Sequence, residues 1–491
     1  MRILFSAPGS AAHVFPMVPT AQALRSAGHD VLFAGQAPVT VLRPTGLPLV
    51  EVGDGTTTAE IFARFSKNGP KELTQEEINR FAVIGFAEHS RSALGDLFRL
   101  TETWRPDVIV HATMQGAAPL VAAVLGIPTM VHNFGVTAGL PYVEGMAAEL
   151  ADEYRARGVT GPPESTVLDV VPASLGGDGT GWRVRYVPFN GGGAVPADLV
   201  ARGGRQRVVV TLGTALSRTA GARYVARLIE QAATVDADFL LALGGADLAP
   251  LGDLPPNVRP LSDWVPLAQL LAGCDAVVHH GGAGSMMASA AVGIPQLFLP
   301  SGADHFTNAA AAVAQGFALR AEPQVVDGDL LDTLVNDDSL RKAAFAMRDE
   351  IAALPSPADL VGDIENLATA LSTESPPAWL TRRCLGSPLS APRPTGADAG
   401  EERPGREQSA SDGHVAHADE PRLLDRVAED GHAQTGRQVE TLLCDAWSGR
   451  GAETGRHPRG LGMSGGAQHQ DVLTTVRGRW VCSTGAGLST L

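Results

Sequence analysis

The chain has 491 residues, of which 44% are hydrophobic and 19% charged, and its net charge at pH 7 is −15. This length predicts roughly two to four domains, and the acidic balance argues against nucleic acid or an anionic membrane as the main partner. No apolar run is long enough to span a membrane, and the four Cys include no CxxC pair, so we expect a cytoplasmic protein.

Short apolar runs alternate with amphipathic stretches through the first 370 or so residues. Such alternation predicts an α/β fold, with parallel sheets covered by helices on both faces. The expected strands in the first half are residues 3–7, 30–34, 106–111 and 127–132, with helices at 17–27 and 117–125. In the second half they are strands 207–212, 239–243, 276–279 and 296–299, with helices at 221–234, 266–271 and 284–291.

The rhythm is interrupted by a Gly- and Pro-rich stretch near residues 190–196. We therefore predict two doubly wound, Rossmann-like domains at residues 1–190 and 207–373, joined by a linker at 191–206. A cleft between them would face the carboxyl ends of both sheets, where ligands bind in this architecture.

The last 118 residues, 374–491, differ in composition and contain no Lys, Ile, Phe, Tyr or Asn. We expect either a disordered extension or GC-rich DNA read in a shifted frame beyond the true C-terminus, with a genuine third domain as the alternative. We place no function in this tail.

The strongest local signal is the sequence VVHHGGAGS at residues 277–285, where a strand ends at two histidines and a helix follows a glycine loop. Gly281, Gly282 and Gly284 would let backbone N–H groups approach a phosphate, and Ser285 occupies the expected helix N-cap. His280 could donate to the same oxygens. The alternative is an ordinary tight turn between a strand and a helix.

Residues on either side strengthen the phosphate interpretation. WVP begins at Trp264, and LFLPSGADHFTN at 297–308 carries the carboxylate of Asp304. These stretches belong to neighbouring strand–helix units, so an aromatic ring, a phosphate loop and a carboxylate would share one sheet edge. Such a set can stack a base, hold a diphosphate and bind sugar hydroxyls.

With these motifs, residues 1–370 resemble the nucleotide-sugar-dependent glycosyltransferases of the GT-B fold, especially the bacterial enzymes that decorate macrolides and aromatic polyketides. The resemblance implies that the donor is a dTDP- or UDP-sugar and that the residues matching the family motif bind it. These are Trp264 and Val265 for the base, His280, Gly281, Gly282, Gly284 and Ser285 for the diphosphate, Thr214 closing over the nucleotide, and Asp304 with His305 at the sugar.

His13 occupies the position of the family's general base, in the glycine-containing loop after the first strand. A neutral imidazole can take the acceptor's proton near neutral pH. A solvated loop histidine is the alternative reading. The resemblance implies inversion at the anomeric carbon, no metal or other cofactor, and an apolar small-molecule acceptor such as an aromatic polyketide.

Three departures from the family pattern leave details open. Many relatives pair the base with an Asp near residue 112, where this chain has Ala112. His305 stands where Gln commonly follows the aspartate. The segment 110–128 is similar to enzymes that include C–C bond formers, so an O- or a C-glycoside is possible.

Other histidines and acids are expected to have ordinary roles. We interpret His29 and His132 as structural, and Glu88, His89 and His111 as substitutes if His13 is not the base. No metal-ligand spacing is present. A nucleotide-sugar epimerase of the same fold and a catalytically inactive partner of a transferase are the rival functions; the oligomeric state is open.

Overall fold

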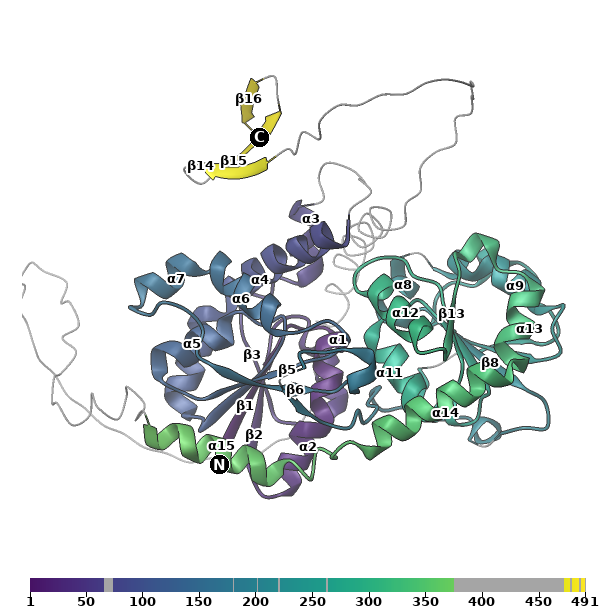
Figure 1. Ribbon diagram of the computed structural model, residues 1–491, viewed down its shortest axis with the longest axis horizontal. Helices are drawn as coiled ribbons and strands as arrows, with labels where there is room; N and C mark the ends of the chain where they lie inside the picture. The colour runs from purple at the N-terminus through teal and green to yellow at the C-terminus, as the bar shows by residue number, and fades with distance from the viewer. Residues whose placement is uncertain are drawn as a thin grey trace, which may run out of the picture. The chain divides into compact units, whose positions relative to one another are not determined.

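The computed structural model describes residues 1–65, 74–179, 181–200, 202–219, 221–261, 264–374, 472–476, 479–484 and 487–490. Its first part holds two parallel sheets, each with helices on both faces (Figure 1). The predicted α/β fold class with two Rossmann-like domains is therefore confirmed.

The first sheet has seven strands in the order β3-β2-β1-β4-β5-β6-β7. In β1, Ile3 and Phe5 pack toward the side of α2, while Leu4 between them packs toward α4 and α5. Both faces of this strand are buried, which explains its continuous apolar run. The elements are β1 (Arg2–Ala7), α1 (Ala11–Val14), α2 (Val18–Ser26), β2 (Asp30–Gly35), β3 (Leu49–Glu51), α3 (Thr58–Phe65), α4 (Gln75–Trp104), β4 (Val108–Ala112), α5 (Ala117–Leu125), β5 (Thr129–His132), α6 (Leu140–Glu149), α7 (Ala151–Ala156), β6 (Ser165–Asp169) and β7 (Trp182–Arg183).

The second sheet has six strands in the order β10-β9-β8-β11-β12-β13. Its consecutive valines divide between the two faces in the same way, with Val208 and Val210 on one side and Val209 on the other. The elements are β8 (Arg207–Thr211), α8 (Gly213–Thr219), α9 (Ala226–Ala232), β9 (Asp238–Ala242), β10 (Val258–Pro260), α10 (Leu267–Ala272), β11 (Ala276–His279), α11 (Ala283–Val292), β12 (Gln296–Phe298), α12 (His305–Ala314), β13 (Ala318–Arg320), α13 (Gly328–Asn336), α14 (Asp338–Ala353) and α15 (Val361–Glu374).

Two predicted helices are shorter than expected. The helix at 17–27 is a 3-10 turn, Phe15–Met17, followed by α2, and the helix at 221–234 is a 3-10 turn, Ala222–Val225, followed by α9. Pro16 and Pro19 lack the N–H that a continuous helix would use, which accounts for the break before α2.

Most of the tail, residues 375–471, lies outside the described residues, so the expectation of disorder or a shifted frame stays a prediction. Its last part contains three antiparallel strands, β14 (Val472–Val476), β15 (Arg479–Thr484) and β16 (Gly487–Thr490). These strands belong to a unit separate from the two parallel sheets.

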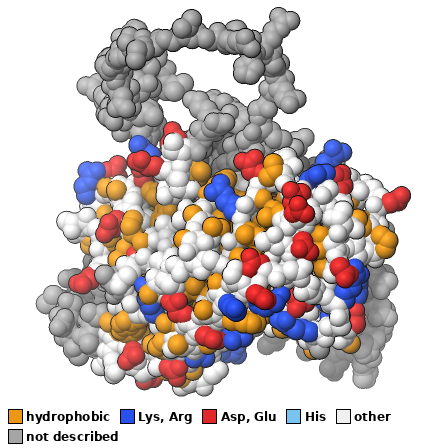
Figure 2. All heavy atoms as spheres, turned by 45° about the vertical axis from the view of Figure 1, so that its right-hand side comes forward, with side chains coloured by type: hydrophobic (Ala, Val, Ile, Leu, Met, Phe, Trp, Pro, Cys, Tyr) orange, Lys and Arg blue, Asp and Glu red, His pale blue; other side chains and the backbone are white. Residues whose placement is uncertain are grey.

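Acidic and basic side chains are interspersed among apolar ones on the face drawn in Figure 2. Ion pairs join some of the acidic and basic side chains in the described part of the chain. Arg205, for example, lies 2.9 Å from Asp236 and 2.8 Å from Asp238. No helix in the described part of the chain is both long and apolar enough to cross a membrane.

Candidate active site

Both sheets reverse their strand order at the first strand of the domain. β1 lies between β2 and β4, and β8 lies between β9 and β11. At such a switch point the loops from the carboxyl ends of the two neighbouring strands leave a crevice in which ligands bind. The loops after β1 and β8 lead to His13 and Thr214, and the loop after β11 carries His280, so these three sequence-predicted residues lie at the switch points.

The glycine loop after β11 does lead into a helix, but the helix begins earlier than predicted. Gly282, with φ −63° and ψ 141°, is the N-cap of α11, and no side chain caps this end. Ser285 therefore lies in the first turn, and the prediction that it is the N-cap is wrong. The free N–H groups of an uncapped first turn are available to an anion.

Gly281 makes a different contribution from the one expected. Its N–H donates to Nδ1 of His279 at 3.1 Å, so this donor is already engaged within the protein. Nε2 of His279 lies 2.8 Å from Oε1 of Gln296, whose Nε2 donates to the carbonyl of Met286 at 3.1 Å. His279 thus fixes the conformation of the loop through its two hydrogen bonds. Gly281, with φ +101°, adopts the left-handed backbone conformation that the turn requires.

His280 lies between two glycine backbones. A methyl group on Gly213 would lie 2.5 Å from Cε1 of His280, and one on Gly282 would lie 2.6 Å from its Nε2. Its Nδ1 is buried and has no hydrogen-bond partner within the described part of the chain. Burial, together with the charges of His305 and His279, holds the pKa of His280 well below its usual value, so the ring is neutral in the free protein.

Asp304 and His305 begin α12 beside this loop. The side chain of Asn308 donates to Oδ2 of Asp304 at 2.7 Å and to the carbonyl of Gly281 at 2.9 Å, joining the carboxylate to the glycine loop. Nδ1 of His305 lies 3.2 Å from Oγ of Ser301, and its ring is 4.8 Å from that of His280. Asn308 is a site residue to which the sequence analysis assigned no role.

Trp264 remains 45% exposed, while its Nε1 donates to the carbonyl of Asn190 at 3.0 Å. This bond fixes the indole edge, and the exposed ring surface can stack on a base. Val265 next to it is half-buried, and Thr214 in the first turn of α8 is exposed.

His13 lies in α1 and is 8% exposed. The ring makes edge contacts with Phe86 and Phe134, with ring centroids 5.2 and 4.8 Å away. Its Nδ1 is buried and finds no hydrogen-bond partner among the residues that the structure describes. Burial, and to a smaller extent the neighbouring His89, lower the pKa of His13 to about 4. Ala112 is buried, and among the described residues no carboxylate is bonded to His13.

The remaining histidines differ in how fully they are paired. His29 lies 3.3 Å from the N-terminal amine and 3.0 Å from Glu365. His132 lies 3.1 Å from Thr20 Oγ1 and 3.0 Å from the Asn133 carbonyl, which supports its structural interpretation.

Of the substitute bases, His111 has one hydrogen bond among the described residues, between its Nδ1 and the neighbouring Ala112 carbonyl at 3.1 Å, while Nε2 of His89 lies 3.0 Å from the Thr56 carbonyl. Burial lowers the pKa of both rings, that of His111 to about 4. Glu88 is engaged with Arg91.

Side chains and backbone of the first domain reach the residues around Asp304, which sequence reasoning did not reveal. Gln75, at the start of α4, donates to the carbonyl of Ala303 at 3.2 Å. A methyl group on Gly135 would lie 3.1 Å from Cβ of Ala283 and 4.0 Å from Oδ2 of Asp304. Burial and the charge of Asp304 raise the pKa of Tyr142.

Within the described ranges no group of three or more His, Cys, Asp or Glu side chains could hold a metal ion. The polar groups of the site are therefore imidazoles, amides, hydroxyls, one carboxylate and helix N–H groups.

Two family models match the chain. The N-terminal domain of erythromycin biosynthesis protein CIII-like proteins matches residues 22–213, and their C-terminal domain matches residues 226–367. Among curated relatives, elloramycin glycosyltransferase ElmGT of Streptomyces olivaceus is 38% identical, over 73% of this chain and 96% of its own length. L-demethylnoviosyl transferase of Streptomyces niveus is 34% identical, over 73% and 96% of the two chains.

Solved structures of glycosyltransferases are similar to this chain as well. The glycosyltransferase SnogD of Streptomyces nogalater has a TM-score of 0.68 and 35% identity, covering 75% of this chain and 99% of its own. Spinosyn rhamnosyltransferase SpnG complexed with thymidine diphosphate has a TM-score of 0.66 and 29% identity, covering 74% and 100%. The likeness spans both sheets and confirms the predicted GT-B fold.

Proposed function

Because this chain belongs to the erythromycin biosynthesis protein CIII-like family of antibiotic glycosyltransferases, we propose that it transfers a deoxysugar from a dTDP- or UDP-sugar to an apolar natural product, with inversion. An aromatic polyketide is the acceptor class that we favour. The observation that carries the proposal is the start of α11, which no side chain caps, beside His280. The buried, neutral His13 packs against Phe134, whose neighbour Gly135 approaches the same helix.

The second domain would hold the donor. The first turn of α11 offers N–H groups to the diphosphate, and His280 adds a side-chain donor, as expected of an anion site built on a helix N-terminus. The exposed ring of Trp264 would stack on the base. Asp304, oriented by Asn308, would accept hydrogen bonds from sugar hydroxyls.

The first domain would hold the acceptor near His13. The rings of Phe86 and Phe134 line the imidazole and suit a flat apolar molecule. The neutral ring would take the proton of the acceptor while the freed oxygen, or the ortho carbon of a phenolate, attacks the anomeric carbon. The nucleoside diphosphate would leave toward α11. Because the acceptor attacks from the face opposite the leaving group, a single displacement inverts the configuration.

A metal ion is unnecessary in this scheme, because His280 and α11 would offset the charge of the leaving diphosphate. We therefore expect turnover to be unchanged by a chelator such as EDTA and by added Mg²⁺. A steep loss of turnover on chelation, restored by one divalent cation, would contradict metal-free transfer.

The decisive variant is His13→Ala. Turnover should fall by about 10²–10⁴, the usual contribution of a positioned base, while affinity for the nucleoside diphosphate stays nearly intact because those contacts lie on the second domain. Assays should use a weakly acidic alcohol acceptor, since a phenol ionises partly without help. Near-normal turnover of the variant from pH 6 to 9 would remove His13 from the reaction and direct attention to His111 and His89.

The same assay separates the rival functions. An epimerase would alter the sugar or release free nucleotide without any acceptor. An inactive partner would yield no product with any donor and acceptor until its active transferase is added. The missing carboxylate at Ala112 is the one observation that favours the inactive partner.

A further inference from the structure

The loop of residues 133–139, between β5 and α6, lies against both parts of the proposed site. Phe134 packs edge-on against His13, with the ring centroids 4.8 Å apart. The next residue, Gly135, lies against the start of α11, where a methyl group on it would approach Ala283 to 3.1 Å. The position of this loop therefore sets the surroundings of the base and of the donor helix together.

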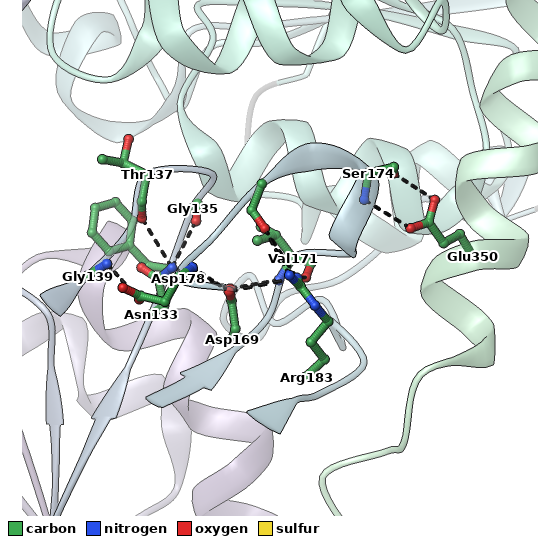
Figure 3. A network of polar contacts seen from close by, with 12 residues as sticks. Asn133, Gly135, Thr137, Gly139, Asp169, Val171, Ser174, Asp178, Arg183 and Glu350 are labelled. Carbon is green, nitrogen blue, oxygen red and sulfur yellow. Dashed lines mark hydrogen bonds and ion pairs between the residues drawn. The ribbon is translucent and has the colours of Figure 1, made fainter. Parts of the chain in front are cut away.

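The loop is held by one buried side chain at its root. Nδ2 of Asn133 donates to the carbonyl of Gly135 at 3.1 Å and to that of Thr137 at 3.2 Å, while its Oδ1 accepts the N–H of Phe134 at 2.9 Å. Figure 3 shows these contacts converging on Asn133. The amide thus ties its own loop into one conformation.

Asn133 is in turn fixed by Asp169, at the end of β6. Oδ1 of Asp169 lies 3.3 Å from Nδ2 of Asn133 and accepts the N–H of Val171 at 3.4 Å; Oδ2 accepts the N–H of Asp178 at 2.9 Å. The side chain is 1% exposed, and Nη1 of Arg183 lies 3.8 Å from Oδ2. Among the described residues, the polar groups recorded against this carboxylate are all donors, so both side-chain oxygens must be acceptors (Figure 3).

The peptide around Asp178 closes over the carboxylate and also supports α6. A methyl group on Gly177 would lie 1.9 Å from Oδ2 of Asp169. The Asp178 side chain accepts the N–H groups of Gly139 at 2.7 Å and Leu140 at 3.2 Å, at the far end of the same loop. Asp169 therefore anchors the start of residues 133–139 through Asn133, and Asp178 anchors the end of the same loop.

We propose that Asp169 is a positioning residue for the transfer reaction, which acts through Asn133 to hold Phe134 over His13 and Gly135 against α11. The inference rests on the proposed role of His13 as the base. Asp169 touches neither donor nor acceptor; it fixes the loop that excludes water from the imidazole.

A measurable consequence follows from burial. His13 owes its low pKa, about 4, first to burial and second to His89, the only titratable side chain among the described residues whose charge acts on it. His89 is itself faced by Asp54. Loosening the loop would admit water to His13, so its pKa should rise toward 6.5.

The test compares Asp169→Asn with Phe134→Ala in the full chain. Asparagine keeps the shape but places an N–H₂ group against existing donors. In both variants the pKa of His13, followed by NMR titration of the ring, should rise toward 6.5, and the acid limb of kcat/KM should move to higher pH by the same amount. Turnover should fall by about 10²-fold in Asp169→Asn, with unchanged affinity for thymidine diphosphate.

The matched control is Asp107→Asn, which removes a carboxylate that accepts the N–H of Arg2 at 2.7 Å, next to the amino end of β4. It should leave the His13 titration and the pH profile unchanged. If Asp169→Asn lowered the melting temperature but left the titration of His13 where it was, Asp169 would be merely structural and the inference wrong. A shifted titration with an unmoved activity profile would uphold the positioning and instead remove His13 as the base.

Discussion

The two adjacent histidines after β11 have different surroundings, and this divides their roles. Both nitrogens of His279 are engaged, one with Gly281 and the other with Gln296. His280 has a buried Nδ1 without a partner and lies beside the open first turn of α11. A buried polar atom without a partner is costly, and a bound diphosphate would supply the missing acceptor.

We expect His280→Ala to weaken binding of thymidine or uridine diphosphate by about 1–3 kcal/mol, the value of a lost charge-assisted hydrogen bond. Titration calorimetry measures this directly. Asn308→Ala serves as a comparison, because it loosens Asp304 and Gly281 without removing a predicted phosphate donor. Unchanged affinity in His280→Ala would exclude the imidazole from the donor site.

His280 should also make the affinity for the nucleoside diphosphate depend on pH. Burial and two neighbouring histidines keep the pKa of free His280 low, and a dianionic ligand beside it raises that pKa in the complex. Binding should therefore take up a proton, and affinity should fall as the pH rises through the pKa of the complex. Calorimetry in two buffers of different ionisation enthalpy counts the proton; His280→Ala should abolish the difference between the buffers.

At the scale of elements, a glycine in the long helix α4 makes room for an aromatic ring on the side proposed to bind the acceptor. A methyl group on Gly85 would lie 2.4 Å from Cε1 of Phe62 in α3. Phe62 contacts Phe86, with ring centroids 5.5 Å apart, and Phe86 contacts His13. The glycine thus lets an aromatic row, Phe62–Phe86–His13, pack against the helix.

Gly85→Ala should displace Phe62 and change the acceptor KM several-fold, with affinity for the nucleoside diphosphate unchanged. Overpacking of this kind costs about 1–3 kcal/mol of stability. Gly95→Ala on the same helix is the control, because its nearest neighbour is the flexible end of Arg99 at 3.5 Å; it should stabilise by about 0.5–1 kcal/mol. Equal effects of the two substitutions on acceptor KM would refute a specific role for Gly85.

The contrast between the proposed donor and acceptor sides explains what the sequence could predict. The proposed donor residues follow strands of one domain, and short-range motifs such as HHGGAGS place them together by topology alone. The proposed acceptor side is assembled from α1, α3, α4 and the 133–139 loop, whose mutual contacts depend on tertiary packing. The sequence predicts Ser285 as the N-cap of α11, whereas the structure has Gly282 there. A glycine can serve as N-cap without any side-chain signal.

The network around Asp169 lay beyond sequence reasoning for the same reason. Asn133 and Asp169 are separated by 36 residues and meet only because β5 and β6 are neighbours in the sheet. Nothing in the local sequence distinguishes this aspartate from one that faces solvent. Its burial and its three donors are visible only in the folded chain.

At the scale of the whole molecule, the homology covers only part of the chain. The matches to the two curated relatives cover 96% of each relative's length but 73% of this chain. The matched family domain ends at residue 367, within α15. Ile364 and Ala368 of this helix are buried, and Glu365 lies 3.0 Å from His29 of the first domain. α15 is therefore packed as part of the folded chain, and it ends at Glu374, slightly beyond the boundary at 373 expected from composition.

We predict that residues 375–491 are dispensable. A chain ending after Glu374 should keep the melting temperature and turnover of the full chain, because the two sheets, the donor loop and His13 all precede that point. A chain ending after Leu360 is the informative control, because it loses α15 and exposes the apolar surface that Ile364 and Ala368 cover. Since burial of one Ile-sized side chain contributes about 1.5–3 kcal/mol, this shorter chain should be less stable by several kcal/mol. Differential scanning calorimetry and transfer assays on the three lengths check this. Loss of soluble protein or of turnover in the chain ending after Glu374 would show that the tail contributes to the working enzyme.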